Sequence, residues 1–463
     1  MCNGLGRYSE GVMGRRKRRQ WPAGSETLRR KVDSSPTRES LYKLKGGDPE
    51  SRVAKKLSAE ERASESERES RVEINGGGGS SSLFALPTLS IAVLSVPQSS
   101  SVGVGINYGQ IADNLPSPAR VAGLLRSLNI NRVKLYDADQ NVLSAFLNTN
   151  VEFIIGIGNE NVENMMDSAK AQAWLQQYVE PHAANGRISC ITVGNEILSG
   201  DDTVLMSGLL PAMQSVYQAL VSLGLDKQIY VTTAHSLQIL ANSFPPSSGS
   251  FREDLAEYIQ PLLNFHAMTK SPFLINAYPF FAYKDDPNSI SLPYALFEPN
   301  PGVVDPNTNL NYDNMLYAQI DSVYSAIRVV GHTDVVVRVS ETGWPSRGDS
   351  SEIGATPENA AAYNGNLLRR VAMNQGTPLM PSIPIDVHVF ALFNENLKPG
   401  PTSERNYGLF YPNGAPVYNI GLKGSLPGKS GSLAAASNHR MVISFPVIIS
   451  LLAALLLYSD ITS

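Results

Sequence analysis

Eight stretches of the chain consist of nearly uninterrupted apolar and β-branched residues, and polar segments with helical spacing separate most of them. A continuous apolar run, unlike one that alternates with polar residues, is typical of a strand covered on both faces. Such strands belong to parallel sheets, whose connections are usually helices. The eight runs are residues 102–109, 132–139, 152–160, 188–196, 229–236, 272–281, 335–345 and 387–396.

Two of the intervening segments carry clear signals for the start of a helix. Ser117 precedes Pro118, and Thr356 precedes Pro357, so in each case a capping side chain stands directly before a proline at the first helical position. Gly376 is the expected end of the second of these helices. Strands that alternate eight times with helices predict an α/β fold, the (β/α)8 or TIM barrel.

The barrel is predicted to occupy residues 102–422. Its sixth and seventh strands are separated by a long polar segment rich in Pro, Asn and Asp, which predicts an insertion between strands 6 and 7. Loops inserted at this point would shape one wall of a site.

The beginning of the chain has a different character. Residues 1–82 are charge-dense and Gly/Ser-rich, and they lack the apolar residues needed for a core of their own. Residues 83–101 contain a short apolar stretch followed by small residues, as in a secretory signal. Two interpretations of residues 1–82 stay open: the true start codon lies downstream of Met1, which we favour, or these residues form a disordered extension.

The end of the chain is apolar. Residues 441–458 are eighteen residues without a charge, and residues 423–440 before them are mostly small and polar. Small residues, a polar spacer and a terminal apolar tail match a signal for a glycosylphosphatidylinositol (GPI) anchor, in which residues 441–463 are removed. We therefore expect secretion to the cell surface and attachment to the outer leaflet of the plasma membrane, with Ser432 as the favoured attachment residue.

Composition narrows the classes of function. The net charge of −4 implies no nucleic-acid partner, and we expect a monomer. The two cysteines are Cys2, in the leader, and Cys190, inside an apolar run, so we expect one buried thiol and no disulfide. A secreted domain without disulfides depends on the size of its core.

Polar and aromatic residues stand where the predicted strands end. In a (β/α)8 barrel these carboxyl ends form the active site. The residues at the ends are Tyr108, Gln110, Tyr136, Asp137, Asp139, Asn159, Glu160, Asn195, Glu196, His235, Tyr278, Phe280, Phe281, Glu341, Trp344, Asn394, Glu395 and Lys398.

Carboxylates flanked by aromatic rings are typical of glycoside hydrolysis, in which one carboxylic acid protonates the leaving oxygen and a carboxylate attacks the anomeric carbon or activates water. Glu196 and Glu341 directly follow the fourth and seventh runs. The sequence has no Gly-rich nucleotide fingerprint, no HExxH and no GxSxG, so we expect no cofactor and no metal.

Several motifs resemble one family. "GINYGQIADNLPSP", "VKLYDAD", "ITVGNEIL", "INAYPFFAY", "VRVSETGWPSRGD" and "FALFNENLKPGPTSERNYGLFYPNG" follow one another in this order across residues 103–419. They are similar to the motifs of glycoside hydrolase family 17, the plant endo-1,3-β-glucosidases and their relatives. Many members of that family append a cysteine-rich carbohydrate-binding module, but this chain has no cysteine after Cys190.

The resemblance implies a (β/α)8 barrel that hydrolyses internal β-1,3 linkages of β-glucan with retention of configuration. It assigns the role of nucleophile to Glu341 and that of general acid/base to Glu196. Retention requires the two carboxyl groups to lie about 5–5.5 Å apart. Asn195 would reach the 2-hydroxyl group of the sugar under attack.

The remaining candidates have weaker signals. Glu395, Lys398 and Glu404 occupy family motif positions, either as electrostatic and positioning groups or as a structural ion pair at the barrel rim. The predicted substrate contacts are Tyr136, Tyr278, Phe281 and Trp344, with Trp344 as a wall of the sugar site. We assign Phe280, Cys190 and His235 to packing.

Two alternatives to an endo-1,3-β-glucanase stay open at this point. One is a retaining barrel glycosidase that acts on mixed-linkage β-1,3-1,4-glucan, because motifs define chemistry better than linkage. The other is a wall-glucan binding protein that does not hydrolyse its ligand. The presence of both Glu196 and Glu341 argues against the second alternative.

Overall fold

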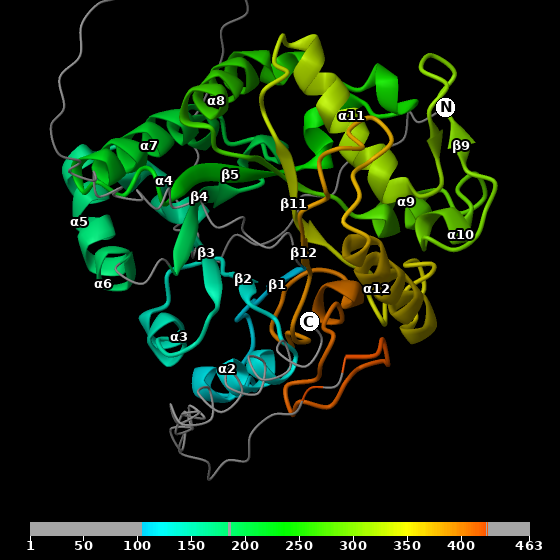
Figure 1. The fold of residues 1–463 in the computed structure, drawn as a ribbon, viewed down its shortest axis with the longest axis horizontal. Coiled ribbons are helices and arrows are strands. Elements are labelled where there is room, and N and C mark those ends of the chain that lie inside the picture. Colours follow the sequence, from blue (N-terminus) through cyan, green and yellow to red (C-terminus); the bar gives the residue numbers. More distant parts are fainter. Residues whose placement is uncertain (1–103, 184–186, 423, 425–463) are drawn as a thin grey trace, which may run out of the picture. The chain divides into compact units, whose positions relative to one another are not determined.

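The chain folds into a closed barrel of eight parallel strands, in the order β1, β12, β11, β8, β5, β4, β3, β2 around its circumference (Figure 1). The computed structural model describes residues 104–183, 187–422 and 424. The prediction of a (β/α)8 barrel is therefore confirmed. The predictions made for residues 1–101 and 425–463 lie outside the described part of the chain.

Each barrel strand lies inside one of the eight apolar runs and is shorter than that run. The strands are β1 (Gly105–Asn107), β2 (Arg132–Lys134), β3 (Glu152–Ile157), β4 (Ile188–Asn195), β5 (Tyr230–Ser236), β8 (Phe273–Asn276), β11 (Val337–Thr342) and β12 (Val387–Val389). The last residues of most runs leave the strand and form the carboxyl edge of the barrel, where the side chains of a site can gather.

Helices follow seven of the eight strands. They are α2 (Pro118–Ser127), α3 (Gln140–Ala145), α4 (Val162–Met165), α5 (Ser168–Tyr178), α6 (Glu180–Ala183), α7 (Thr203–Ser222), α8 (Ala256–Thr269), α11 (Met315–Val329) and α12 (Pro357–Ala372). Short 3-10 helices are η1 (Asn159–Asn161), η2 (Ile197–Ser199), η3 (Leu237–Ile239), η4 (Pro246–Ser248), η5 (Glu253–Leu255) and η6 (Thr402–Arg405).

The two predicted helix starts are both present. The Thr356 side chain accepts a hydrogen bond from the Asn359 amide at 3.2 Å, whereas Ser117 precedes α2 without a side-chain cap. The predicted end of α12 was wrong, because the helix ends at Ala372. Gly376 lies in the following loop, where the Met380 carbonyl approaches too closely for a side chain.

Helix α7 is the one described helix that is long and apolar enough to cross a membrane by length and composition alone. Its apolar residues are explained by its place in the fold. Its inner face, which includes Leu209, Met213 and Val216, is buried, and the helix packs on β4, β5 and the helices α4 and α5.

The insertion between strands 6 and 7 is present. It contains α9 (Pro279–Asp285), α10 (Leu292–Ala295) and a hairpin of β9 (Val303–Val304) and β10 (Asn311–Tyr312), and it precedes α11 (Figure 1). A second, unpredicted hairpin of β6 (Leu240–Asn242) and β7 (Ser250–Phe251) lies between β5 and α8.

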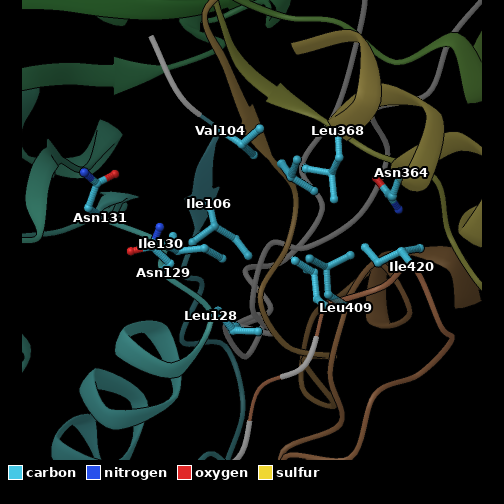
Figure 2. Close-up of a pocket in the computed structure, with 12 residues that line it drawn as sticks. Val104, Ile106, Leu128, Asn129, Ile130, Asn131, Asn364, Leu368, Leu409 and Ile420 are labelled. Atoms are coloured by element: carbon cyan, nitrogen blue, oxygen red, sulfur yellow. The ribbon is translucent and has the colours of Figure 1, made fainter. Parts of the chain in front are cut away.

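The eighth strand has no helix after it among the described residues. Residues 390–422 run instead as loops with η6, and they lie between α12 and α2 (Figure 1). A pocket of about 340 Å³ lies here, against the outer side of β1 and β12 (Figure 2). Its lining is mostly apolar and includes Ile106, Leu128, Leu368, Leu409 and Ile420.

Cys190 and His235 pack in the interior, as predicted. The Cys190 thiol is free and buried, and burial raises its pKa to about 12. The His235 ring stacks on Phe273 with the centroids 4.6 Å apart, and burial lowers the pKa of His235 to about 3. Both groups therefore stay uncharged at neutral pH and behave as core residues.

Candidate active site

The two predicted carboxylates stand at the same edge of the barrel. Glu341 lies within β11, and Glu196 directly follows β4, with β8 and β5 between these strands. The pairing of β11 with β8 shifts register just before Glu341, and that of β4 with β5 shifts just before Asn195. Such irregularities re-aim side chains, and they are common beside active sites.

Glu196 has an unusual backbone. Its φ of 55° lies in the left-handed region, which a residue with a side chain seldom adopts. The conformation is held by the amide of Glu196, which donates to the Ala234 carbonyl at 2.8 Å. Strained conformations of this kind concentrate at functional sites, where the surrounding structure enforces them.

Glu341 is surrounded by donors. Lys134 Nζ lies 2.7 Å from Glu341 Oε1, and the Tyr278 hydroxyl donates to Oε2 at 3.0 Å. The Glu341 residue is 6% exposed and Lys134 only 1%. Burial by itself would raise the pKa of Glu341. The Lys134 ammonium and its hydrogen bond, the Lys398 charge and a hydrogen bond from Tyr136 together outweigh burial, so the pKa falls below its usual value. Glu341 is therefore ionised at neutral pH.

The pKa of Glu196 is shifted in the opposite direction. Burial raises its pKa, and the negative charge of Glu341 raises it further. A hydrogen bond from Asn276 Nδ2 to Glu196 Oε1, at 2.8 Å, opposes the shift only in part. The two carboxyl groups thus have pKa values pushed apart, which is the pattern that divides an acid from a nucleophile.

Asn195 is fixed on two sides. Its backbone amide donates to Asn159 Oδ1 at 2.7 Å, and its carbonyl accepts from Asn159 Nδ2 at 3.0 Å. Its side-chain oxygen accepts from Asn276 Nδ2 at 3.4 Å. Because the oxygen is engaged, the Asn195 amide nitrogen is the group left to donate to a sugar hydroxyl.

The aromatic candidates separate into two kinds. Tyr136 and Tyr278 are half-buried, and Tyr278 also bonds to Glu341. The Lys134 ammonium lies 4.1 Å from the centroid of the Tyr136 ring. Phe281 is 37% exposed and lies beside Tyr278, with ring centroids 5.4 Å apart. Phe281 therefore has an open face for a sugar ring. The two tyrosines instead contact the charged groups, Tyr278 through its bond to Glu341 and Tyr136 through the Lys134 ammonium over its ring.

Trp344 is not a wall of the sugar site, and this prediction was wrong. Its side chain is 0% exposed, and its indole N–H donates to the Gly354 carbonyl at 2.8 Å. The ring packs between Phe280 and Tyr363, at centroid distances of 5.3 and 5.6 Å. Trp344 anchors the loop after β11 to the core, and the predicted packing role of Phe280 is confirmed by its full burial.

The loop after β12 contains the remaining acidic and basic candidates. Glu395 is 3% exposed, and its Oε1 accepts from the Ile111 amide at 2.8 Å, which ties this loop to the one after β1. Lys398 and Glu404 form an ion pair at 3.3 Å. The Lys398 charge also contributes to the lowered pKa of Glu341. Both predicted roles, rim ion pair and electrostatic support, therefore apply to Lys398.

Sequence reasoning missed Lys134, Asn276 and Tyr407. Lys134 stands inside an apolar run, and a charge in a buried strand was the available signal. Asn276 ends β8 and gave a similar but weaker signal. Tyr407, 2% exposed, packs edge-on against Tyr278, and only its place in the tertiary structure marks it. The described residues contain no cluster of His, Cys, Asp and Glu suited to a metal ion.

A parallel barrel whose carboxyl edge carries two glutamates, one with a lowered and one with a raised pKa, is the arrangement of a glycoside hydrolase. Residues 104–422 match the family model for glycosyl hydrolases family 17. The chain belongs to this family.

Curated relatives are similar over most of their length. Glucan endo-1,3-beta-glucosidase 14 of Arabidopsis thaliana is 68% identical over 326 residues, which cover 70% of this chain and 83% of that protein. Glucan endo-1,3-beta-glucosidase 11 of the same plant is 54% identical over 344 residues, 74% of this chain and 80% of that protein.

Solved structures agree with the fold. The beta-1,3-glucanase and pollen allergen CJP38 of Cryptomeria japonica superposes with a TM-score of 0.66 at 38% identity, over 69% of this chain and 99% of that one. A plant beta-glucan endohydrolase, from a study of two with distinct substrate specificities, gives a TM-score of 0.63 at 36% identity, over 68% and 99%.

Proposed function

We propose that the chain is a glucan endo-1,3-β-glucosidase that cleaves internal linkages of cell-wall β-1,3-glucan with retention, with Glu341 as nucleophile and Glu196 as general acid/base. The observation that carries these roles is the unlike surroundings of the two carboxyl groups at one barrel edge: the Lys134 ammonium lies 2.7 Å from Glu341, and the neutral Asn276 amide lies 2.8 Å from Glu196. The opposite directions of their pKa shifts agree with this division. The family match and the names of the curated relatives support the reaction and the linkage.

The geometry supports two displacements. In the first, a Glu341 carboxylate oxygen attacks the anomeric carbon, the glycosidic bond breaks, and Glu196 gives its proton to the departing oxygen. In the second, ionised Glu196 takes a proton from water, and the water oxygen displaces Glu341 from the same carbon. Two inversions amount to retention. Asn195, beside Glu196, would bind the 2-hydroxyl group through its amide nitrogen, and the exposed ring of Phe281 would stack on a sugar ring.

Linkage preference is tested by comparing laminarin, a β-1,3-glucan, with mixed-linkage β-1,3-1,4-glucan. We expect oligosaccharides with the β-anomer formed first from laminarin, little release from the mixed-linkage polymer, and a loss of at least about 10³-fold in Glu341→Gln, because the nucleophile is removed. Reducing-sugar release measures the rate of cleavage of each polymer, and the NMR signal of the new anomeric proton identifies the anomer that forms first. Faster cleavage of the mixed-linkage polymer would identify a β-1,3-1,4-glucanase in place of a β-1,3-glucanase. No cleavage of either polymer would favour a glucan-binding protein without hydrolytic activity.

We further propose that the mature enzyme is a monomer held by a GPI anchor at the plasma membrane, where it faces the cell wall. The proposal rests on the apolar stretches near both ends of the sequence, and the described site supports a monomer because one chain supplies both carboxylates.

A further inference from the structure

We infer that Asn276 is a positioning residue that confines the acidic proton of Glu196 to the Oε2 oxygen and so sets the direction of proton delivery. The inference rests on the proposed function, because it concerns the general acid of that reaction. It is carried by a set of hydrogen bonds that joins Ser340, Asn276, Asn195 and Glu196.

The position of Asn276 in the barrel makes this role possible. Asn276 ends β8, the strand between β5 and β11, and its Cα is paired with those of Glu341 and Ser236. The residue is 3% exposed. Its backbone therefore lies beside the nucleophile, while its side chain reaches the general acid.

The orientation of the Asn276 amide follows from its partners. The Ser340 hydroxyl donates to Asn276 Oδ1 at 2.6 Å, which leaves the amide nitrogen facing Glu196 Oε1 at 2.8 Å. The opposite orientation would set the amide oxygen against the Glu196 carboxylate, two acceptors in contact, during the half of the reaction in which Glu196 is ionised.

The consequence for the proton is a matter of hydrogen-bond chemistry. An amide N–H can only donate, so Glu196 Oε1 accepts in this bond. The bond favours the carbonyl form of Oε1, because a carbonyl oxygen is a better acceptor than the hydroxyl oxygen of a carboxylic acid. The proton of the acid form is then on Oε2. Among the described residues Oε2 has no hydrogen-bond partner, so this oxygen remains available to the glycosidic oxygen of the substrate.

Leaving-group dependence tests the inference. We would compare kcat/KM of the wild type and Asn276→Ala on laminarin and on a dinitrophenyl β-glycoside of laminaribiose, whose acidic phenol departs without protonation. For both substrates kcat/KM reports the first displacement only. We expect Asn276→Ala to lose about 10²-fold on laminarin, within the range of general acid catalysis, and less than about threefold on the aryl glycoside.

The pH profile gives a second readout that a structural role would not move. The hydrogen bond from Asn276 lowers the pKa of Glu196, so its loss raises that pKa. Because Glu196 must be protonated, the basic limb of kcat/KM on laminarin should move to higher pH in Asn276→Ala. Ser340→Ala, which only frees the amide to rotate, should cause smaller changes in the same direction.

Asn364→Ala is the matched control. Asn364 is also a fully buried asparagine with a side-chain partner, Tyr418, but it lies on α12 away from both carboxylates. The Asn364→Ala substitution should lower the melting temperature, while the ratio of kcat/KM on laminarin to that on the aryl glycoside should stay as in the wild type. Equal losses on both substrates, or an unmoved basic limb, in Asn276→Ala and Ser340→Ala would overturn the inference while the proposed function stands. Wild-type inactivity on laminarin would overturn both.

Discussion

Lys134 brings a positive charge into the barrel interior, where lysine is rarely found. Its only close carboxylate among the described contacts is Glu341, and the two atoms that join them, Nζ and Oε1, are 2.7 Å apart. A buried charge persists when it is paired, and the removal of one partner leaves the other uncompensated. Lys134 and Glu341 therefore stabilise each other, and the charge of the nucleophile depends on the lysine.

Lys134→Met should move the acidic limb of the pH profile. The nucleophile must be ionised, and without the ammonium the burial of Glu341 would raise its pKa. On acidification, the variant should therefore lose activity at a higher pH than the wild type does. We expect kcat/KM on laminarin to fall about 10²-fold or more near neutral pH.

Lys134→Arg is the matched control for this change. Arginine keeps the positive charge, so the acidic limb should stay close to that of the wild type, with a smaller loss of activity caused by altered geometry. A pH profile of kcat/KM measured for all three proteins distinguishes the cases. An acidic limb that is the same in Lys134→Met and the wild type would contradict the assigned role.

At the scale of elements, the loop after β11 differs most from expectation. The sequence places Trp344 three residues after the nucleophile, which suggested a sugar-binding wall. In the structure the backbone turns at Gly343, where a side chain would collide with the Phe390 carbonyl, and the indole enters the core. The loop is thereby fixed to α12 through Tyr363 and to the insertion through Phe280.

Trp344→Phe should therefore affect stability and leave substrate affinity unchanged. The substitution removes the hydrogen bond to the Gly354 carbonyl and part of a fully buried ring, which should cost about 2–3 kcal/mol of the free energy of unfolding. Phe281→Ala should do the opposite, because its exposed ring can be removed with little loss of packing.

Chemical denaturation and KM for laminarin measure these two effects. The expected result is a lowered midpoint with unchanged KM for Trp344→Phe, and an unchanged midpoint with a KM raised about threefold or more for Phe281→Ala. A large increase in KM for Trp344→Phe, at a temperature where it is folded, would restore the sugar-wall role.

At the scale of the whole molecule, the candidate site and the last described residues lie towards opposite ends of the barrel. The carboxylates lie at the carboxyl ends of the strands, whereas Val104 and Asn131, which directly precede β1 and β2, line the pocket in Figure 2. Leu422 lines the same pocket. The last described residues thus lie towards the amino ends.

Phosphatidylinositol-specific phospholipase should release the protein from plant membranes in an active form, because a GPI anchor is cut outside the polypeptide. Immunoblots of the soluble and membrane fractions measure the release, and a protein with a spanning helix serves as the control. Retention in the membrane after complete digestion of known anchored proteins would contradict the anchor proposal.

The alternation of apolar runs with helical segments was enough to predict the number of barrel strands, and the position of Glu196 and Glu341 at strand ends was enough to predict the two carboxylates. These are local properties, because burial on both faces and the end of a strand are written in adjacent residues. The roles of Lys134 and Asn276, and the burial of Trp344, were decided only in the tertiary structure. They depend on register shifts, on contacts between residues 207 and 80 positions apart in the chain, and, for Trp344, on packing against Phe280 and Tyr363. No local pattern specifies which of these side chains meet.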